Sequence, residues 1–266
     1  MKKIRLDQLV FDRGLTESRE RAKTSVMLGL VSVNGQRVDK PGTPVDESAV
    51  LELKGEAIPF VSRGGLKLEK ALKIFDFDPT GLVCIDCGAS TGGFTDVLLK
   101  NDAKKVFAVD VGYGQLAWSL RCDGRVVNME RTNIRYVTPE ILGEAIDLAV
   151  MDLSFISIRL VLPVVHELIK DGAFVICLIK PQFEAGREKV GKKGVVREKA
   201  THIEVVRAFL EFAPTAGYTP LGLGYSPIRG PEGNIEYLAL LRKGNYEAPA
   251  LDAETVVEAS HGELEK

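Results

Sequence analysis

The run Leu82-Val83-Cys84-Ile85-Asp86-Cys87-Gly88-Ala89-Ser90-Thr91-Gly92-Gly93-Phe94-Thr95 decides the fold of this 266-residue chain. An apolar strand ends in a carboxylate, a glycine-rich turn follows, and the turn leads into the start of a helix. An open α/β sheet holds a nucleotide-like cofactor in this way. The run therefore predicts an α/β fold of the Rossmann type with a cofactor at the turn.

The spacing of the run favours S-adenosylmethionine over a dinucleotide. A pyrophosphate needs bare backbone N–H groups at a helix N-terminus, whereas a methionine-like ammonium needs a carboxylate, which Asp86 supplies. Asp110 ends the next apolar strand, where an acidic residue can accept both ribose hydroxyls of an adenosine. Glu130, within the segment 128–133, is expected beside the adenine. The residues expected to hold the methionine end are Asp86, Gly88, Ala89, Ser90, Gly92, Gly93 and Phe94.

Strands and helices continue to alternate after this run. The expected strands are 82–86, 105–109, 125–129, 146–152, 173–179, 218–226 and 235–242, and the expected helices include 113–121, 158–169 and 199–213. Such alternation predicts a mostly parallel, doubly wound sheet with its ligands at the carboxyl ends of the strands. The last two strands are joined by the Gly/Pro-rich turn 229–233, which favours one antiparallel strand.

The first 60 residues are typical of a small α+β module. Helices are expected over 5–13 and 17–28, the second with Thr16 as its N-cap, followed by strands over 30–33, 36–38 and 49–53. Asn34-Gly35 supplies the positive φ angles of a type I′ hairpin turn. The expected core residues of the two helices are Leu6, Leu9, Val10, Ala22, Val26 and Met27.

Composition narrows the class of protein. The net charge of −2 comes from 35 basic and 37 acidic residues, with a basic N-terminal edge and an acidic tail. The apolar runs are far shorter than a membrane-spanning helix, and no signal peptide is recognisable, so we expect a cytoplasmic protein that does not insert into membranes. Cys84 and Cys87 make a C-x-x-C pair without a second pair, which favours buried strand cysteines over a metal site.

Four charged residues fall where a sheet of this order has its ligand crevice. Asp152 and Lys180 close predicted strands, Glu236 opens the last one, and Lys67 lies on the helix that follows residue 64. The carboxyl ends of central strands and the start of an antiparallel neighbour face the same crevice, so we expect these side chains to meet there. A methyl transfer to a hydroxyl needs help in removing the proton, and Lys180 is the candidate. Either Lys180 acts as a base or it stays charged and stabilises the alkoxide; the sequence leaves both roles open.

Two resemblances follow from these motifs. The N-terminal residues Arg5-Leu6-Asp7, 18–22 and Val31-x-Val33-Asn34-Gly35 resemble the alpha-L type of RNA-binding module. Lys67, Asp152, Lys180 and Glu236 are similar in order and context to the Lys-Asp-Lys-Glu tetrad of FtsJ-like ribose 2′-O-methyltransferases. Residues 1 to about 243 resemble the TlyA family, whose members are described as ribosomal RNA (cytidine-2′-O)-methyltransferases and as haemolysins.

The resemblance implies a domain plan and a partner. We expect an RNA-binding module over 1–58, a linker over 59–64, a methyltransferase domain with a seven-stranded sheet over 65–243 and an acidic tail over 244–266. Ribosomal RNA or ribosomal subunits are the expected partner, and the oligomeric state stays open. The expected RNA contacts are Arg5, Arg19, Arg21, Lys23, Arg63, Arg187, Lys189, Lys192 and Lys193.

Other interpretations remain beside this one. The basic segment 182–198 is either a mobile lid over RNA or solubilising loop. The whole chain is either a methyltransferase, an RNA-binding ribosome factor with little or no turnover, or a membrane-active haemolysin. The lack of an amphipathic or spanning segment counts against the last of these.

Overall fold

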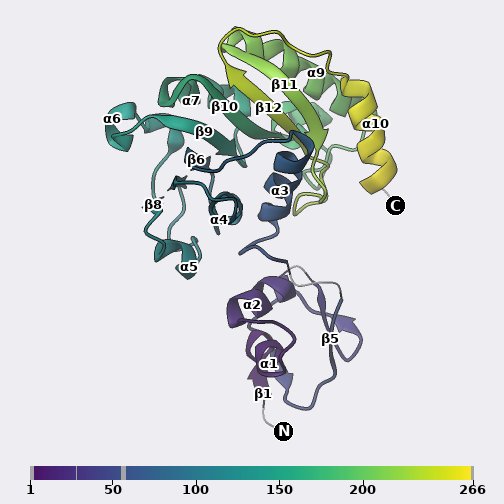
Figure 1. The fold of residues 1–266 in the computed structure, drawn as a ribbon. Helices are drawn as coiled ribbons and strands as arrows, with labels where there is room; N and C mark the ends of the chain where they lie inside the picture. Colours follow the sequence, from purple (N-terminus) through teal and green to yellow (C-terminus); the bar gives the residue numbers. More distant parts are fainter. Residues whose placement is uncertain (1–2, 28, 55–57, 265–266) are drawn as a thin grey trace. The chain divides into compact units, whose positions relative to one another are not determined.

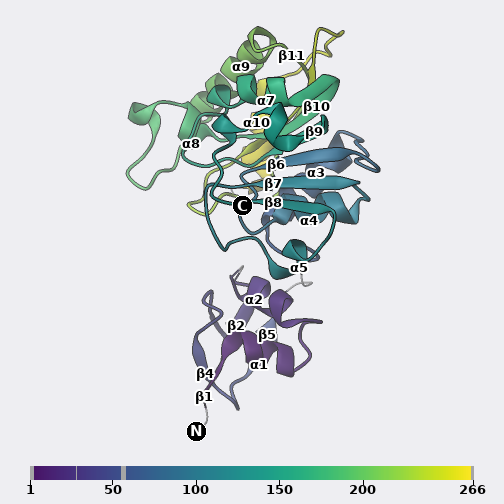
Figure 2. The ribbon, with the colours of Figure 1, turned by 90° about the vertical axis from the view of Figure 1, so that its left-hand side faces the viewer.

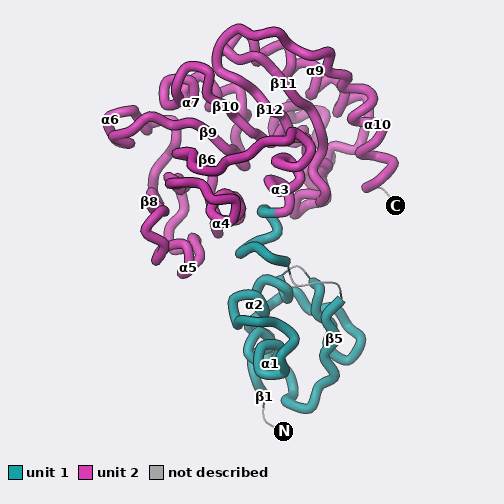
Figure 3. The backbone as a smooth tube through the Cα atoms, in the orientation of Figure 1, with its two compact units in different colours: residues 1–65 teal, residues 66–266 magenta. Residues whose placement is uncertain are grey.

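The structure is a computed structural model that describes residues 3–27, 29–54 and 58–264. It divides into two compact units, residues 1–65 and 66–266, which Figure 3 shows in different colours. Residues 55–57 of the expected module and residue 28, the expected end of its second helix, lie outside the described residues.

The first unit consists of two helices and two small sheets. Strand β1 pairs antiparallel with β4, and the other sheet has the order β3-β2-β5. The elements are β1 (Lys3–Arg5), α1 (Leu6–Asp12), α2 (Arg19–Met27), β2 (Val31–Val33), β3 (Gln36–Arg37), β4 (Pro44–Asp46) and β5 (Leu51–Leu53). The hairpin turn forms as expected, with φ of 50° at Asn34 and 78° at Gly35.

The helices of the first unit bury most of the predicted residues. The core consists of Leu6, Leu9, Val10, Ala22, Val26, Val31 and Val45. Met27 was expected to face inward but is 53% exposed. The prediction of Thr16 as N-cap is also wrong: α2 begins at Arg19, and Arg21 N donates to Ser18 Oγ at 3.2 Å. Thr16 instead donates its hydroxyl to the Ser18 carbonyl, so the first turn starts later.

The second unit alternates strands and helices around one sheet (Figure 1). Its strands are β6 (Val83–Cys87), β7 (Lys105–Val109), β8 (Val126–Met129), β9 (Ile146–Met151), β10 (Ile169–Ile179), β11 (Tyr218–Tyr225) and β12 (Tyr237–Lys243). Its α-helices are α4 (Gly93–Lys100), α5 (Trp118–Arg121), α6 (Pro139–Leu142), α7 (Leu162–Leu168), α8 (Pro181–Glu184), α9 (Lys199–Thr215) and α10 (Ala253–Leu264). Helix α3 (Gly64–Ile74) begins at the unit boundary, and 3₁₀ turns occur at Ile134–Tyr136, Ile158–Leu160 and Arg187–Lys189.

The sheet has seven strands in the order β11-β12-β10-β9-β6-β7-β8. Strands β10, β9, β6, β7 and β8 run parallel, and β12 is antiparallel to both of its neighbours. The predicted fold class is therefore confirmed, including the single reversed strand. Figure 2 shows β9, β6, β7 and β8 in succession. The chain order changes direction between β6 and β9, and such a switch point opens a crevice at the carboxyl ends of the strands.

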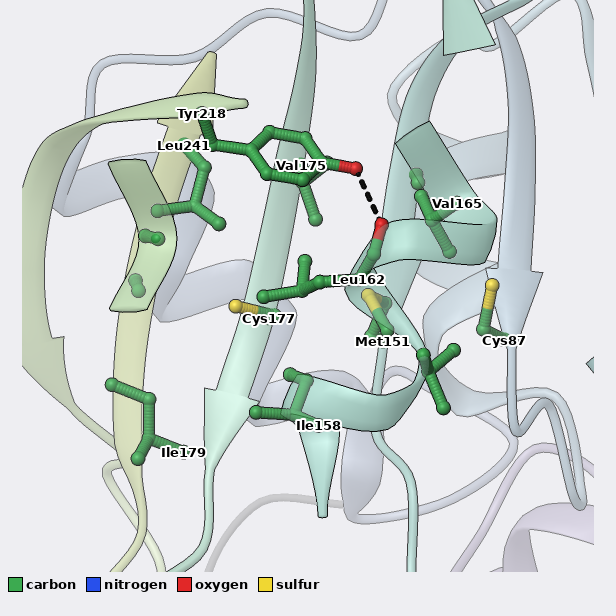
Figure 4. Close-up of a cluster of buried hydrophobic side chains, with 14 of the residues drawn as sticks. Cys87, Met151, Ile158, Leu162, Val165, Val175, Cys177, Ile179, Tyr218 and Leu241 are labelled. Atoms are coloured by element: carbon green, nitrogen blue, oxygen red, sulfur yellow. Dashed lines mark hydrogen bonds between the residues drawn. The ribbon is translucent and has the colours of Figure 1, made fainter. Parts of the chain in front are cut away.

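A large apolar core lies between one face of the sheet and helices α7, α9 and α10. Figure 4 shows part of it, where Met151, Val175 and Cys177 of the sheet meet Leu162 and Val165 of α7. The buried hydroxyl of Tyr218 donates to the Leu162 carbonyl at 2.9 Å, which satisfies both polar groups inside the core. Helix α10 contributes Ala253 and Val257, so the acidic tail ends in a helix that takes part in this core.

Two predicted helices of the second unit are shorter than expected. Over 113–121 only Trp118–Arg121 is helical, because Gln115 N and Leu116 N donate to the Glu130 carboxylate instead of to helical carbonyls. Over 158–169 a 3₁₀ turn precedes α7, whose first turn contains Pro163. Proline lacks the N–H that a continuous helix needs, and it favours a helix start.

Helix α3 lies against the edge strand β11 at two glycines. A Cβ atom placed on Gly222 would lie 2.6 Å from the Phe75 ring, and one on Gly224 would lie 2.4 Å from Ile74 Cδ1. Bare backbone at these positions makes room for the end of α3. The same helix carries Lys67, so the two glycines help to place that side chain.

Candidate active site

The glycine turn after β6 lies directly against Asp152, which follows β9. Asp152 N donates to the Cys87 carbonyl at 3.2 Å, and a Cβ atom on Gly88 would lie 3.0 Å from the Asp152 carbonyl oxygen. Gly88 also has a φ of 89°. Only glycine tolerates both the positive φ and this close approach. The cofactor turn and the predicted catalytic carboxylate are thus neighbours.

The turn itself has the shape of a cradle for a small ligand. Gly88 N and Ala89 N both donate to the Val109 carbonyl, and Ser90 has a φ of 49°. Gly92, with a φ of 96°, precedes α4 and offers no side-chain cap to it. Gly93 begins α4, whose Phe94 is buried at 4% exposure. The first N–H groups of a helix without an N-cap side chain attract negatively charged groups such as a carboxylate.

Asp86 lies buried beneath this turn. Its Oδ2 accepts Thr95 N at 2.9 Å and Thr95 Oγ1 at 2.7 Å, which anchors the start of α4. Its other oxygen, Oδ1, is buried and has no hydrogen-bond partner. Burial raises the pKa of Asp86 to about 7, and the two hydrogen bonds from Thr95 offset only part of that effect. The orphaned oxygen and the bare turn both fit a ligand that brings its own donors, although direct contact of Asp86 with an ammonium stays a prediction.

Asp110 and Glu130 organise the loops on the other side of the turn. Asp110 accepts Ser90 N at 2.8 Å and Gly112 N at 2.6 Å, one on each oxygen, so each oxygen keeps a lone pair for a hydroxyl. Burial would raise the pKa of Glu130, but the Arg121 guanidinium and backbone N–H groups outweigh it and lower the pKa to about 2. Glu130 therefore holds the segment that follows Asp110.

The structure brings Lys67, Asp152, Lys180 and Glu236 into one cluster. Lys67 Nζ lies 3.1 Å from Asp152 Oδ2 and 2.7 Å from Glu236 Oε2. Lys180 Nζ lies 2.6 Å from Asp152 Oδ1 and 4.0 Å from Glu236 Oε1. Two ammonium groups and two carboxylates alternate, so the cluster is close to neutral although its two lysines and Glu236 are buried.

The charges of the cluster fix the ionisation of two of its members. Burial disfavours the ammonium of Lys67, but Asp152 and Glu236 outweigh burial and raise its pKa above the usual value. Burial likewise acts against the charged form of Asp152, but Lys67 and Lys180 lower its pKa below the usual value. Lys67 is therefore an ammonium and Asp152 a carboxylate at neutral pH.

Strand register places Glu236 opposite Lys180. Ile179 of β10 pairs antiparallel with Tyr237 of β12, so the two residues just beyond that pair lie side by side. Glu236 is 1% exposed, and a Cβ atom on Gly230 would lie 2.7 Å from its Oε1. The glycine in the preceding turn therefore leaves space for the carboxylate.

An exposed aromatic pair lies next to the cluster. Lys180 Nζ donates to Ser154 Oγ at 3.2 Å, and the next residue, Phe155, is 92% exposed with a φ of 64°. Its ring lies 5.5 Å from that of Phe183, between centroids. A positive φ in a phenylalanine is strained, and such strain is concentrated at functional sites.

The residues predicted to bind RNA are all at least partly exposed, but four of them have acidic partners. They are Arg5, Arg19, Arg21, Lys23 and Arg63 in the first unit and Arg187, Lys189, Lys192 and Lys193 in the second. The partners are Asp7 for both Arg5 and Arg19, Glu17 for Arg21 and Glu204 for Lys189.

The basic segment 182–198 is anchored to the turn that carries Glu236. Asn234 Oδ1 accepts Val196 N at 2.9 Å, and Asn234 Nδ2 donates to the Gly194 carbonyl at 2.8 Å. Residues Pro181–Glu184 and Arg187–Lys189 also form short helices. The far end of the segment is thus bound to the rest of the domain.

Three residues of this region escape a reading of the sequence. Val111, directly after Asp110, is 71% exposed and lies where an adenine is expected; an apolar residue after an acidic strand end was its signal. Glu184 accepts Ser157 Oγ and Ile158 N, both at 2.7 Å. For Glu184 and Asn234 no local pattern gives the contact, because their partners are distant in the sequence.

Comparison with known proteins supports the same site. Residues 60–243 match the family model of the FtsJ-like methyltransferases, and residues 4–51 match the S4 domain. The 16S/23S rRNA (cytidine-2′-O)-methyltransferase TlyA of Mycobacterium tuberculosis is 44% identical over 91% of this chain and 90% of its own.

Two solved structures are also similar. One from Streptococcus thermophilus, described as a suspected hemolysin, is 48% identical, covers 100% of this chain and 98% of its own, and gives a TM-score of 0.80. One from Listeria monocytogenes, described as a suspected S-adenosylmethionine-dependent methyltransferase, covers 68% of this chain and 98% of its own with 16% identity and a TM-score of 0.51. The second similarity concerns the fold alone.

These matches confirm the predicted family, the enzyme class and S-adenosylmethionine as the cofactor. Within the described ranges, no helix has both the length and the apolar character needed to cross a bilayer. With an S4 domain before an FtsJ-like methyltransferase domain and a close relative along nearly its whole length, the chain belongs to the TlyA family of FtsJ-like methyltransferases.

Proposed function

We propose that this chain transfers a methyl group from S-adenosylmethionine to a ribose 2′-hydroxyl of ribosomal RNA, at a cytidine. The observation that carries the proposal is the cluster of Lys67, Asp152, Lys180 and Glu236 beside the glycine turn. The name of the M. tuberculosis relative supports cytidine 2′-O chemistry and ribosomal RNA as the substrate. Ribosomal RNA as substrate makes the cytoplasm the proposed place of action.

The chain's own residues divide the cofactor between them. The turn residues Gly88, Ala89, Ser90, Gly92 and Gly93 hold the methionine end, and Phe94 supports the turn from within. Asp110 accepts the ribose hydroxyls, while Val111 and the segment held by Glu130 border the adenine. When bound, S-adenosylmethionine supplies a methyl group on a sulfonium, which an oxygen nucleophile displaces in line.

Lys180 acts on the nucleophile. It already donates to Asp152 and Ser154, so its remaining position points either a lone pair or a third N–H toward the hydroxyl. As a neutral amine Lys180 takes the proton; as an ammonium it stabilises the developing alkoxide. Asp152 orients Lys180, and Lys67, held as an ammonium, neutralises Asp152 and Glu236.

RNA is held by cations on both units. The S4 match covers Arg5, Arg19, Arg21 and Lys23, and the segment 182–198 offers Arg187, Lys189, Lys192 and Lys193 beside the domain that carries the cluster. Phosphate contacts by lysine and arginine position a protein on RNA, whereas the 2′-hydroxyl is read at close range. We propose that residues 59–64 link the two functions.

The test uses ribosomal subunits from a strain that lacks this gene. Radioactive methyl transfer is measured with the full chain, and nuclease digestion followed by mass spectrometry identifies the modified nucleoside. Lys180→Ala should lower the rate at least about a thousandfold, in the range typical of lost acid–base or electrostatic catalysis. Lys170→Ala, on the same strand but half-exposed and paired with Asp147, is the matched control and should leave the rate unchanged.

Lys180→Arg separates the two roles of Lys180. Arginine keeps the charge but cannot accept a proton at accessible pH, so a base mechanism predicts an inactive variant. An electrostatic mechanism predicts measurable activity for the variant. Strong RNA binding without any product that depends on Lys180 would contradict the proposed function and favour an RNA-binding factor.

A further inference from the structure

In the first unit, Asp7 is a buried carboxylate between two half-exposed arginines. The side chain of Asp7 is 4% exposed, whereas those of Arg5 and Arg19 are 54% and 50% exposed. Arg5 lies on β1 and Arg19 begins α2, so the two come from different elements. Asp7 thus joins two cations that are separated along the chain.

Both guanidinium groups converge on one oxygen of Asp7. Arg5 donates Nε to Oδ1 at 3.0 Å and Nη2 to Oδ2 at 2.9 Å, which is a bidentate contact. Arg19 Nη2 lies 3.6 Å from the same Oδ2. A Cβ atom on Gly42 would lie 3.2 Å from Arg5 Nη1, so bare backbone leaves room for the guanidinium. The shared oxygen holds two like charges close together.

The backbone fixes Asp7 firmly. Its N–H donates to the Pro41 carbonyl at 3.0 Å, and its Oδ1 accepts Gln8 N at 3.0 Å. Burial would raise the pKa of Asp7, but the hydrogen bonds and charge of Arg5, with the charge of Arg19, lower it below its usual value. The carboxylate is therefore ionised and immobile at neutral pH.

We propose that Asp7 is a positioning residue that holds Arg5 and Arg19 as a preformed pair for one RNA phosphate. The inference rests on the proposed function, because it takes RNA as the partner of the first unit. A phosphate has several acceptor oxygens, and two guanidinium groups aimed at one point match it. Fixing two long side chains in advance removes part of the entropy cost of binding them to a ligand.

This proposal and simple electrostatics predict opposite signs. RNA is a polyanion, so removal of a negative charge from a binding face should tighten binding if charge alone matters. If Asp7 acts by positioning, its removal should weaken binding, because the two arginines then repel each other and lose their fixed geometry. Asp7→Asn removes the charge with little change in volume and keeps an acceptor for Gln8 N.

The experiment measures binding of the full chain to radiolabelled 16S and 23S ribosomal RNA by filter retention. Asp7→Asn should bind about tenfold more weakly than the unsubstituted chain. Glu17→Gln is the matched control: Glu17 pairs with Arg21 but is 80% exposed, so the same loss of charge should leave binding equal or tighter. In methyl transfer, Asp7→Asn should raise the KM for RNA without changing kcat.

A double-mutant cycle separates positioning from a loss of folding. In an Arg5→Ala/Arg19→Ala background, Asp7→Asn should cause no further loss if it acts through those arginines. A further loss there, or binding by Asp7→Asn that equals or exceeds the unsubstituted chain, overturns the inference and leaves the proposed function intact. Failure of the unsubstituted chain to bind or methylate either RNA would instead overturn the proposed function.

Discussion

Asp86 is a carboxylic acid without solvent exposure, placed beneath the turn that holds the cofactor. Its pKa in the folded protein is about 7, against 3.8 for the free side chain. Because the folded state binds the proton more tightly than the unfolded state, folding is favoured at low pH, and stability is lost as the pH rises from about 4 to about 7. A proteins' active site commonly retains such a group at the expense of stability.

Asp86→Asn should therefore stabilise the protein above pH 7. The shift corresponds to an upper estimate of about 4 kcal/mol, so a gain of about 1–3 kcal/mol is expected at pH 8 and almost none at pH 4. Chemical denaturation at both pH values measures the difference. The same variant should bind S-adenosylmethionine more weakly in calorimetry, because the charge below the turn is gone. A variant that is less stable at pH 8 would contradict this reading of Asp86.

At the scale of elements, Glu184 joins two segments that end neighbouring strands. It lies on α8, directly after β10, and accepts hydrogen bonds from Ser157 Oγ and Ile158 N in the segment after β9. Asp152 and Ser154 belong to that second segment, and Lys180 ends β10. Burial raises the pKa of Glu184 above its usual value despite those hydrogen bonds. The carboxyl thus keeps the two strand ends in register with each other.

Glu184→Ala should loosen that connection. Loss of the acceptor leaves Ile158 N without its partner, which costs about 1–3 kcal/mol in a buried setting. We expect kcat to fall at least tenfold with a small change in the KM for S-adenosylmethionine, and Glu184→Gln to restore most of the rate. Glu188→Ala, exposed on the following 3₁₀ turn, is the control. Equal losses in both alanine variants would argue against this role.

At the scale of the whole molecule, charge distribution rather than net charge governs binding to RNA. The net charge is −2, so attraction to a polyanion depends on local groups of arginine and lysine. Contacts to phosphates release counterions, and their strength falls steeply with salt. The KM for ribosomal RNA should rise at least tenfold between 50 and 200 mM salt, while the affinity for S-adenosylmethionine changes little. Steady-state kinetics and calorimetry over that range test this; parallel changes in both would contradict it.

Much of the architecture follows from local patterns. The apolar run before Gly88 predicts β6, and the helical spacing of Leu6, Leu9 and Val10 predicts α1, because side-chain periodicity needs no distant partner. The positive φ angles at Asn34 and Gly35 follow from residue type alone. Where local preference competes with a tertiary contact, prediction fails: Glu130 takes the N–H groups of residues 115 and 116, so no helix forms there.

The sequence by itself determined the order of the strands along the chain, the glycine turn and the identity of the four charged residues, since these depend on neighbours in the chain. Only the tertiary structure decided how those residues meet. Pairing of Ile179 with Tyr237 brings Glu236 beside Lys180, and the bare strand at Gly222 admits the helix that carries Lys67. Distances of a few ångströms between residues far apart in sequence depend on register and packing across the whole sheet, and local chemistry does not specify either.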